Sequence, residues 1–550
     1  MILVFILWIF AFAIFYIIGF SVVRFVERLW PKPTNSHSFG TSEYFFMGFL
    51  VLSVIAGILS ILIPLGTYVL LGVCFLVVVL FFLQLKVFKT IIGIASIAIR
   101  NIRRRDFFIY LFITLFVLMV LSQPIKLWDT ELYHAQYIKW IRNYAVVPGL
   151  GNIHGRFAFN SMFFVVSGLF TFEIGDILIY PLNGICLLVL AYKLIKFFLN
   201  SCDSLWKSVF YGSLLLVLFA LVSHSLNSPS PDIICAVLIV YAFLYVLDFD
   251  KTKLFGVVHF LLLSLLIFSC ITYKLSSVFI VLLLIPALRL DFRRGAWVSV
   301  IAGILVIMPF LLRNYYLSGY LVYPFPSVDI FNVDWKMPIA NVIDEKLWIE
   351  SWARIPGKTP DEVLKLNFIE WFYPWLGRIG GFERIVIAVN AFLVLVFAFV
   401  IVKRERVLWG LIAIILVNLT FWFVNAPAPR FVYGFLILGF SFALALPIKF
   451  LNISSKKILA NRHYLLLIIM FVISFRYFSY PIKKPSAVIL PGPFGKAEIE
   501  IRNDHFSYKH SLSDSRCYNA ELPCTPYPLE NVEMRGDDLG DGFRVAKMSQ

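Results

Sequence analysis

Apolar runs of 17–22 residues recur along this chain from residue 1 to about residue 479. A helix of about 20 apolar residues matches the roughly 30 Å hydrocarbon core of a bilayer. The composition agrees, because 61% of the residues are hydrophobic and 15% are charged, against about 45–50% and about 25% in soluble domains. The sequence therefore predicts an all-α polytopic membrane protein and excludes a soluble enzyme.

Fourteen apolar segments are long enough to be predicted as membrane spans. A further apolar stretch, residues 157–173, is predicted to enter the membrane as a short re-entrant helix without crossing it, which requires protein around its ends. The predicted spans are 1–22, 43–64, 67–87, 107–123, 178–197, 207–225, 232–248, 254–271, 275–290, 296–312, 383–402, 407–424, 430–448 and 463–479.

The formal net charge of +16 comes largely from Lys and Arg in short loops between apolar segments, and such loops are typically cytoplasmic. They share one side of the membrane only if 157–173 does not cross. Segments 124–156 and 312–382, both termini and the tail then lie outside. No nucleic-acid partner is expected, because no basic patch alternates with base-stacking aromatic residues, and the lipid bilayer is the expected partner. The basic loops are 86–105, 193–207, 251–253, 289–294, 403–406 and 456–462.

Three parts are expected along the chain. Residues 1–106 hold N-terminal spans and a basic loop, and the first apolar run is predicted to be a retained span because no cleavage site follows it. Residues 107–480 form the core. The polar tail, 481–550, contains Cys517 and Cys524 with six residues between them. A disulfide between these two cysteines requires an oxidising compartment, which agrees with an outward tail.

The most informative stretch is the outward segment that begins Leu127-Trp-Asp-Thr-Glu-Leu-Tyr-His134. Apolar residues then recur at helical spacing, which predicts a helix on the outer membrane surface directly after a span. Asp129 and Glu131 stand at the start of this helix. His154, Arg156 and Asn160 return polar groups to the membrane face, where such groups are costly unless they bind something.

Polar residues also stand at the outward ends of later spans. Asp232 ends the motif Ser228-Pro-Ser-Pro-Asp232, and Lys274 lies between two closely spaced spans. Arg313 and Asn314 open the large outward loop, and Arg430 lies in Pro427-Ala-Pro-Arg430-Phe-Val-Tyr433 at the start of a late span.

This layout resembles the GT-C superfamily of integral-membrane glycosyltransferases over about residues 107–480. The resemblance rests on acidic residues directly after a span, an interfacial helix, a His-led motif at His154 and the Arg motifs around Arg313 and Arg430. It implies a GT-C-like helical bundle in a bacterial cytoplasmic membrane, with its active site facing outside. The implied reaction is an inverting transfer of a sugar from a polyprenyl-phosphate donor to a glycan, lipid or protein acceptor.

The resemblance also implies residue roles. Asp129 is the expected base, because a carboxylate takes the proton of the acceptor hydroxyl as that oxygen attacks; Glu131 is a second candidate base or a metal ligand. Arg430 and Arg313, with Lys274 as a weaker candidate, are expected to bind the leaving phosphate, for which an Arg fork is well shaped. The remaining substrate-binding candidates are His154, Arg156, Asn160, Asp232 and Asn314.

Six of these candidates also have a purely structural interpretation. Asp129 and Asp232 can cap helices, Arg430 can extend to the membrane surface, and Lys274 can anchor at the interface. Arg313 can simply end a span, and His154 can be a surface histidine. No cofactor is established, because no spacing is typical of zinc; a divalent ion held by distant carboxylates stays open.

Two other functions stay open. A transporter or flippase of lipid-linked sugars would favour inverted repeats and charges near the midplane, neither of which is clear in this sequence. A glycan polymerase or ligase would use Arg and His in outward loops. Segment 312–382 carries a predicted amphipathic helix, 345–354, and five Trp residues that suit either sugar stacking or the membrane interface. They are Trp335, Trp348, Trp352, Trp371 and Trp375.

Overall fold

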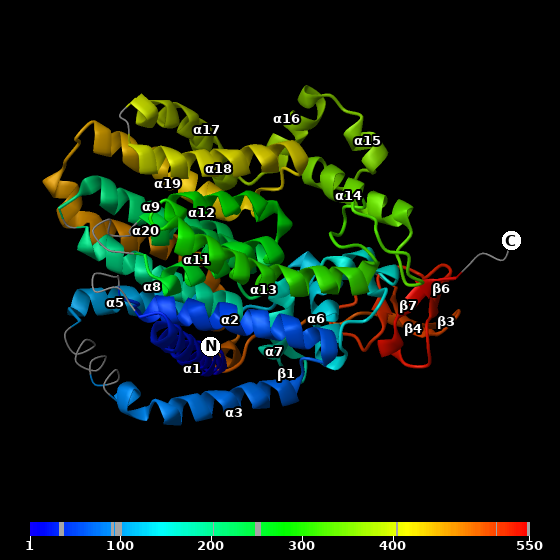
Figure 1. The fold of residues 1–550 in the computed structure, drawn as a ribbon. Helices are drawn as coiled ribbons and strands as arrows, with labels where there is room; N and C mark the ends of the chain where they lie inside the picture. The colour runs from blue at the N-terminus through cyan, green and yellow to red at the C-terminus, as the bar shows by residue number, and fades with distance from the viewer. Residues whose placement is uncertain are drawn as a thin grey trace.

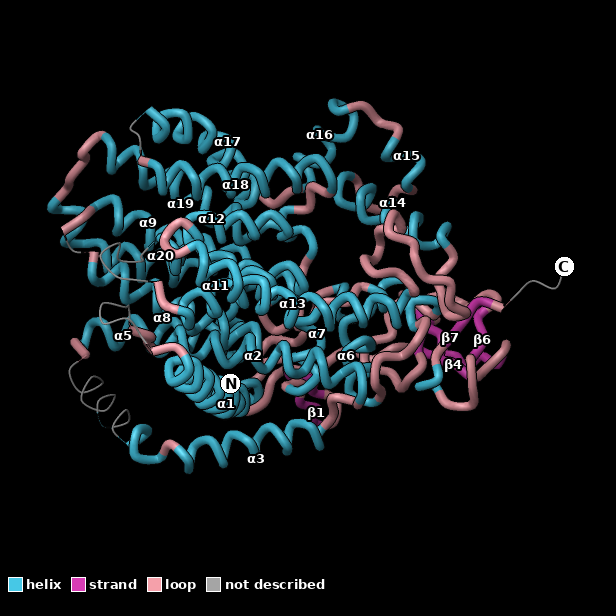
Figure 2. Tube along the Cα trace, viewed as in Figure 1, coloured by secondary structure: helices cyan, strands magenta, loops and turns pink. Residues whose placement is uncertain are grey.

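Helices form almost all of the bundle, and short strands gather at one end of it (Figures 1 and 2). The computed structural model describes residues 1–31, 38–89, 93, 102–201, 203–247, 255–402, 405–512 and 514–546. Two of the predicted basic loops, 251–253 and the first residues of 403–406, lie outside these ranges, as does most of 90–101.

Within the described residues, nine helices are long and apolar enough to cross a membrane. Each coincides with a predicted span, so the apolar part of the chain is an all-α membrane protein, as the sequence predicted. The nine are α1 (Ile2–Leu29), α2 (Thr41–Leu62), α8 (Leu182–Asn200), α9 (Leu205–Val222), α13 (Phe292–Ser318), α17 (Gly381–Val402), α18 (Arg406–Asn425), α19 (Tyr433–Phe450) and α20 (Lys456–Lys483).

Four other predicted spans are shorter or more polar helices, so the count of fourteen spans stays a prediction. They are α3 (Thr67–Leu83), α5 (Arg104–Leu121), α10 (Pro231–Leu247) and α11 (Val257–Tyr273). The predicted span 275–290 is not one α-helix but a 3₁₀ helix, Leu275–Leu283, followed by α12 (Leu284–Leu288). Pro286 lies in this region. A proline disturbs a regular α-helix because it has no backbone N–H to donate and because its ring clashes with the preceding turn.

The segment 157–173 contains a helix that is too short to cross a bilayer. Helix α7 (Met162–Leu169) has eight residues, which at about 1.5 Å per residue gives about 12 Å. The hairpin of β1 (Phe172–Ile174) and β2 (Ile177–Ile179) follows directly. This geometry agrees with the prediction that the segment does not cross.

Helices α1 and α2 cross at two glycines. A Cβ atom on Gly19 would lie 1.8 Å from the Tyr44 carbonyl oxygen, and one on Gly48 would lie 1.8 Å from the Phe15 carbonyl oxygen. Small residues let membrane helices approach this closely. Because α1 and α2 also pack against α11, and α2 against α13, the first helices share one hydrophobic core with the later ones.

The large loop after α13 follows a helix that is longer than the predicted span 296–312. Helix α13 continues to Ser318 and ends at Gly319, whose φ of 83° suits a glycine helix cap. Arg313 and Asn314 therefore lie in the last turns of α13. The loop contains α14 (Ile339–Arg354), which includes the predicted helix 345–354, and then α15 (Pro360–Leu364) and α16 (Phe368–Arg378).

The tail folds into short strands at the end of the bundle where segment 124–158 lies (Figure 1). Strands β3 and β4 pair antiparallel, β4 and β5 pair parallel, and β6 pairs antiparallel with β7. The strands are β3 (Ile499–Asn503), β4 (Ser507–Ser511), β5 (Cys524–Thr525), β6 (Val532–Met534) and β7 (Phe543–Val545).

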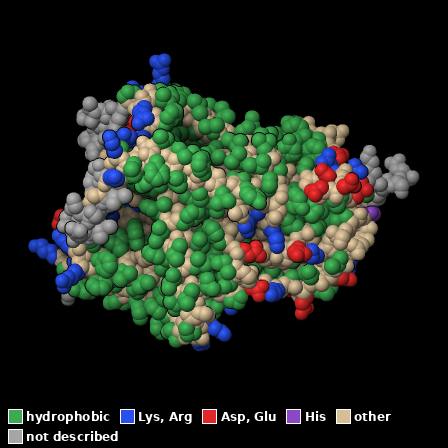
Figure 3. All heavy atoms as spheres, turned by 90° about the horizontal axis from the view of Figure 1, so that it is seen from below, with side chains coloured by type: hydrophobic (Ala, Val, Ile, Leu, Met, Phe, Trp, Pro, Cys, Tyr) green, Lys and Arg blue, Asp and Glu red, His purple; other side chains and the backbone are tan. Residues whose placement is uncertain are grey.

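Charged side chains gather toward the two ends of the molecule. Figure 3 shows a face covered mainly by hydrophobic side chains, with mostly Lys and Arg at the left end and Asp and Glu mixed with Lys and Arg toward the strand-bearing right end. An apolar belt between polar ends is the surface that a bilayer requires.

The crossing of α1 and α2 can be tested with Gly48→Leu. The leucine side chain meets backbone rather than a movable side chain, so the destabilisation should exceed the roughly 1–3 kcal/mol of ordinary overpacking. Thermal unfolding in detergent measures this effect. Gly72→Leu on α3 is the matched control, because a Cβ there meets nothing within 4 Å; equal melting temperatures for both variants would contradict the proposed crossing.

Candidate functional site

Four charged side chains from separate helix ends meet at one place. Arg430 donates from Nη1 to Oδ2 of Asp129 at 2.6 Å, and its Nε lies 3.7 Å from Oδ2 of Asp232. Asp232 in turn forms an ion pair with Lys274, whose ammonium lies 3.9 Å from the centre of the Phe431 ring. We call Asp129, Asp232, Lys274 and Arg430 the charged quartet.

Asp129 is directed to this quartet rather than to its own helix. It precedes a π-helical turn, Thr130–His134, which leads into α6 (Ala135–Asn143), and its side chain makes no capping bond. Burial alone would raise the pKa of the Asp129 carboxyl, but Arg430, and also Arg156, keep that pKa below its ordinary value. Asp129 is therefore ionised at neutral pH.

Hydrogen bonds of neutral groups fix the two carboxylates relative to each other. Thr130, next to Asp129, shares a 2.7 Å hydrogen bond with the hydroxyl of Ser228. The amide of Asn183 donates to the carbonyls of Ser228 and Ser230, at 2.8 and 3.0 Å. The motif 228–232 thus links the start of the Asp129 turn to the start of α10.

Two tryptophans hold the segment that precedes Arg430. Trp375 on α16 donates to the Pro427 carbonyl at 2.6 Å, and Trp422 on α18 donates to the Ala428 carbonyl at 2.8 Å. Trp375 is almost fully buried. Its role in this structure is therefore to position the Arg430 segment, and it has no face free for a sugar.

The quartet is partly exposed although protein surrounds it. The side chain of Arg430 is 37% exposed and that of Asp129 is 19% exposed. Two acids and two bases cancel in formal charge, which lowers the cost of holding four charges in a partly buried place. A ligand anion that reaches Arg430 competes with Asp129 and Asp232 for the same guanidinium.

A second polar group lies beside the quartet and contains two of the predicted residues. Arg156, in the 3₁₀ helix Gly155–Ala158, pairs with Glu345 of α14, with 2.6 Å between Nε and Oε1. The hydroxyl of Tyr323 and Nε2 of His154 are buried and make no hydrogen bond to the described residues. We call His154, Arg156, Tyr323 and Glu345 the polar cluster.

Arg313 and Asn160 form a separate, enclosed group. The guanidinium of Arg313, 2% exposed, donates to Asn160 Oδ1 at 3.0 Å, to the Ser60 hydroxyl at 2.8 Å and to the Tyr137 hydroxyl at 3.1 Å. Asn314 donates to the Leu321 carbonyl at 2.8 Å. The structure thus places Arg313 and Asn314 away from the quartet, where they tie α13 to α2, α6 and the next turn.

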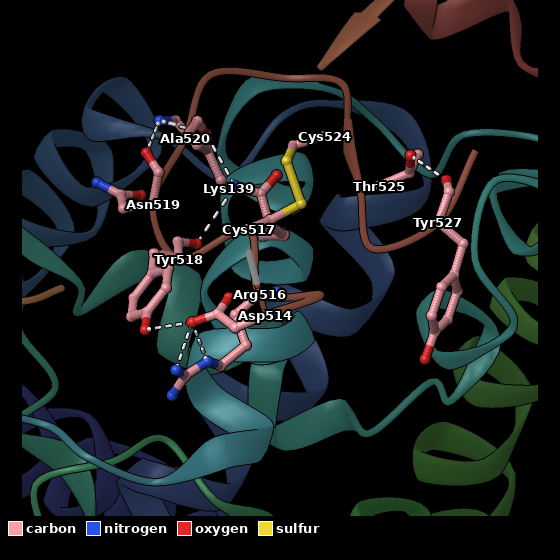
Figure 4. Close-up of a disulfide and its surroundings, with 11 residues drawn as sticks. Lys139, Asp514, Arg516, Cys517, Tyr518, Asn519, Ala520, Cys524, Thr525 and Tyr527 are labelled. Carbon is pink, nitrogen blue, oxygen red and sulfur yellow. Dashed lines mark hydrogen bonds and ion pairs between the residues drawn. A yellow bond between two sulfur atoms is a disulfide. The ribbon is translucent and has the colours of Figure 1, made fainter. Parts of the chain in front are cut away.

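Glu131 points away from the quartet and toward the tail. Its carboxylate lies 2.5 Å from Nη1 of Arg516, which also pairs with Asp514, and its carbonyl accepts from the Tyr518 N–H at 2.8 Å. Figure 4 shows this part of the tail, where Cys517 and Cys524 form a disulfide and Lys139 of α6 donates to two tail carbonyls. Burial raises the pKa of Glu131. Glu131 thus fastens the tail to the segment that bears Asp129.

Comparison with known families gives one match, to the domain of unknown function DUF8201 over residues 1–437. The chain belongs to the DUF8201 family. The match includes all residues of the quartet and of the polar cluster, and it ends before the tail. No curated protein and no solved structure matches the chain.

Several residues that contact the site were not predicted as site residues from the sequence of this DUF8201 chain. Glu345 was predicted only as part of an amphipathic helix. Thr130, Ser228 and Tyr323 lie in motifs in which other residues, Asp129, Asp232 and Arg313, were the predicted site residues. Arg516 lies in a tail with no periodic pattern. Among the described residues, no group of three or more His, Cys, Asp or Glu side chains is arranged to hold a metal ion.

The buried residue His134 makes the stability of this DUF8201 chain depend on pH. Burial lowers the pKa of His134 from 6.5 to about 4. The unfolded chain therefore binds a proton at this residue below about pH 6.5, and the folded chain does not, so stability falls as pH drops from 6.5 to 4. The depressed pKa of Asp129 acts only at lower pH, below its ordinary value of 3.8.

We expect the melting temperature in detergent to fall between pH 7 and pH 5, and to fall less in His134→Gln. Parallel curves for the two proteins would contradict the neutral, buried state of this histidine. His505→Gln in the tail provides a control histidine.

Proposed function

We propose that this chain is a membrane glycosyltransferase of GT-C type. It moves a sugar, with inversion, from a polyprenyl-phosphate donor to an extracytoplasmic glycan, lipid or protein acceptor, and it works in a bacterial cytoplasmic membrane with its site facing outside. The observation that carries the proposal is the ion pair of Asp129, in the segment after α5, with Arg430, just before α19.

The two residues have complementary tasks in this reaction. Asp129 is ionised and can accept the proton of an acceptor hydroxyl as that oxygen attacks the anomeric carbon. The bond to the lipid phosphate breaks at the same time, and its oxygen gains negative charge. Arg430, with Lys274 close by, stabilises that charge through the two-pronged geometry of a guanidinium.

Arg430 also couples donor binding to the strength of the base. In the free protein its guanidinium lowers the proton affinity of Asp129. A phosphate that binds Arg430 takes over part of this interaction, so the proton affinity of Asp129 rises when the donor is in place. The carboxylate is then a better base when a sugar is ready to be transferred.

The other functions are less well supported by the same geometry. A transporter or flippase of lipid-linked sugars needs the phosphate contact but no ionised carboxylate next to it. A glycan polymerase or ligase that depends on Arg and His would use Arg430 and Arg156 but would not need Asp129. The role of Asp129 therefore separates the three.

The test uses the full chain in nanodiscs with undecaprenyl-phosphate-linked sugars and a membrane glycan extract. Asp129→Asn keeps the shape of the side chain and removes its basicity, so release of free undecaprenyl phosphate should fall by at least about 100-fold, the usual range for loss of a general base. Binding of the lipid should persist. Asp176→Asn, an exposed carboxylate paired with Lys496, is the matched control and should release lipid at the native rate.

Two results would redirect the assignment. If Asp129→Asn turns over normally and Glu131→Gln does not, Glu131 is the base and the tail contact opens during the reaction. If the native protein binds lipid-linked sugars but releases no undecaprenyl phosphate with any of them, a transporter becomes the better proposal.

Arg430→Gln tests the phosphate contact separately. It removes the positive charge shared by Asp129 and Asp232, so affinity for free undecaprenyl phosphate should fall by about 10- to 100-fold, as expected for a lost charge-assisted hydrogen bond. Equilibrium binding of the radiolabelled lipid measures this change. Arg384→Gln, in the first turn of α17, provides an arginine control, and equal affinity in both variants would argue against the contact.

A further inference from the structure

The polar cluster has properties of a ligand site rather than of a structural ion pair alone. Tyr323 is 2% exposed, and its hydroxyl makes no hydrogen bond to the described residues. Nε2 of His154 is also buried and also makes no hydrogen bond to the described residues. A buried polar atom without a partner costs about 1–3 kcal/mol, so two in one cluster indicate groups that obtain partners from a ligand.

Two groups of the cluster pack closely against one glycine. A Cβ atom on Gly155 would lie 2.8 Å from Oε2 of Glu345 and 3.1 Å from the Tyr323 hydroxyl oxygen. The Arg156 and Glu345 side chains remain 29% and 17% exposed, so the cluster is reachable from outside. Because Gly155 has no side chain, the Glu345 carboxylate and the Tyr323 hydroxyl both pack against its backbone, next to Arg156.

The chemistry of the cluster favours a neutral polyol over an anion. Glu345 offers a carboxylate that accepts hydrogen bonds and repels phosphate, whereas Tyr323, His154 and Arg156 supply donors. The ring of Phe159 lies 5.3 Å from that of Tyr323 and 5.4 Å from the Arg156 guanidinium carbon, and it adds an apolar surface. Adjacent hydroxyls on a sugar ring satisfy such a mixed set of acceptors and donors.

The cluster adjoins the quartet through Arg156. The charge of Arg156 contributes to the depressed pKa of Asp129 on one side, and the same guanidinium pairs with Glu345 on the other. Arg156 therefore connects the quartet and the polar cluster electrostatically.

We infer that His154, Arg156, Tyr323 and Glu345 form a subsite that binds the hydroxyl groups of a sugar ring. The inference rests on the proposed glycosyl transfer, and it assigns sugar recognition to α14 and the 3₁₀ helix Gly155–Ala158. The donor sugar and a sugar of the acceptor share this chemistry, and binding experiments separate them.

The test measures binding to the full chain in nanodiscs. One series compares free undecaprenyl phosphate with a panel of undecaprenyl-phosphate-linked hexoses and pentoses, and a second uses free disaccharides. We expect the native protein to bind at least one sugar-linked form more tightly than free undecaprenyl phosphate. Tyr323→Phe and Glu345→Gln should each weaken that form by about 10-fold or more and leave free undecaprenyl phosphate unchanged.

Tyr323→Phe distinguishes a role of the Tyr323 hydroxyl in sugar recognition from a role in stabilising the fold. It removes a hydroxyl that makes no hydrogen bond to the described residues, so the melting temperature should stay the same or rise while sugar discrimination falls. Glu350→Gln on α14 is the matched control, because Glu350 pairs with Lys346 one turn before it, at 3.8 Å, and lies outside the polar cluster.

Each outcome decides the inference. Weaker binding of sugar-linked lipid alone assigns the subsite to the donor sugar, and weaker binding of a disaccharide alone assigns it to the acceptor. Unchanged binding in both series overturns the subsite, as does a native protein that binds no sugar more tightly than free undecaprenyl phosphate. If both variants lose discrimination while the native protein releases no undecaprenyl phosphate, the subsite stands and glycosyl transfer fails.

Discussion

The guanidinium of Arg430 is the interaction on which the candidate site depends. It lies between Asp129 and Asp232, and it joins the segment after α5 to the starts of α10 and α19. These carboxylates would repel each other in a partly buried place without a cation between them. Four helix ends, at residues 129, 232, 274 and 430, thus bring together charges that balance, and the balance leaves Arg430 accessible to a ligand.

The bilayer explains why such charges are concentrated and why they are sorted. Helices that face lipid carry apolar side chains all round, so polar groups have few places to lie other than helix ends and the bundle interior. Arg313 shows the interior solution, in which neutral oxygens of Asn160, Ser60 and Tyr137 accept from all three nitrogens of a buried guanidinium. Arg430 shows the other solution, in which ionised partners hold a guanidinium that a ligand can still reach.

The sequence predicted the apolar helices well because each carries its own signal, a run of residues matched to the bilayer. It also placed Asp129, Asp232, Lys274 and Arg430 among the candidates, because a charge at the end of a span is conspicuous. It could not separate Arg430 from Arg313, since both begin or end apolar segments and only tertiary contacts show that one is enclosed. The end of α13 was missed for a related reason: Arg-Asn-Tyr-Tyr-Leu-Ser is compatible with either helix or loop, and the backbone turns only at Gly319.

Glu345 and Tyr323 show what a local sequence pattern cannot assign. Each lies in a segment whose pattern does not mark it as a site residue, and they meet Arg156 only because the loop after α13 folds back over the segment that follows α6. The result is a site of two unlike halves, with a cation that attracts phosphate beside a carboxylate that repels it. A glycolipid has this same polarity, an anionic linkage next to a neutral ring. In the proposed reaction, the position of α14 governs how a sugar ring is presented to Asp129, because Glu345 of α14 pairs with Arg156.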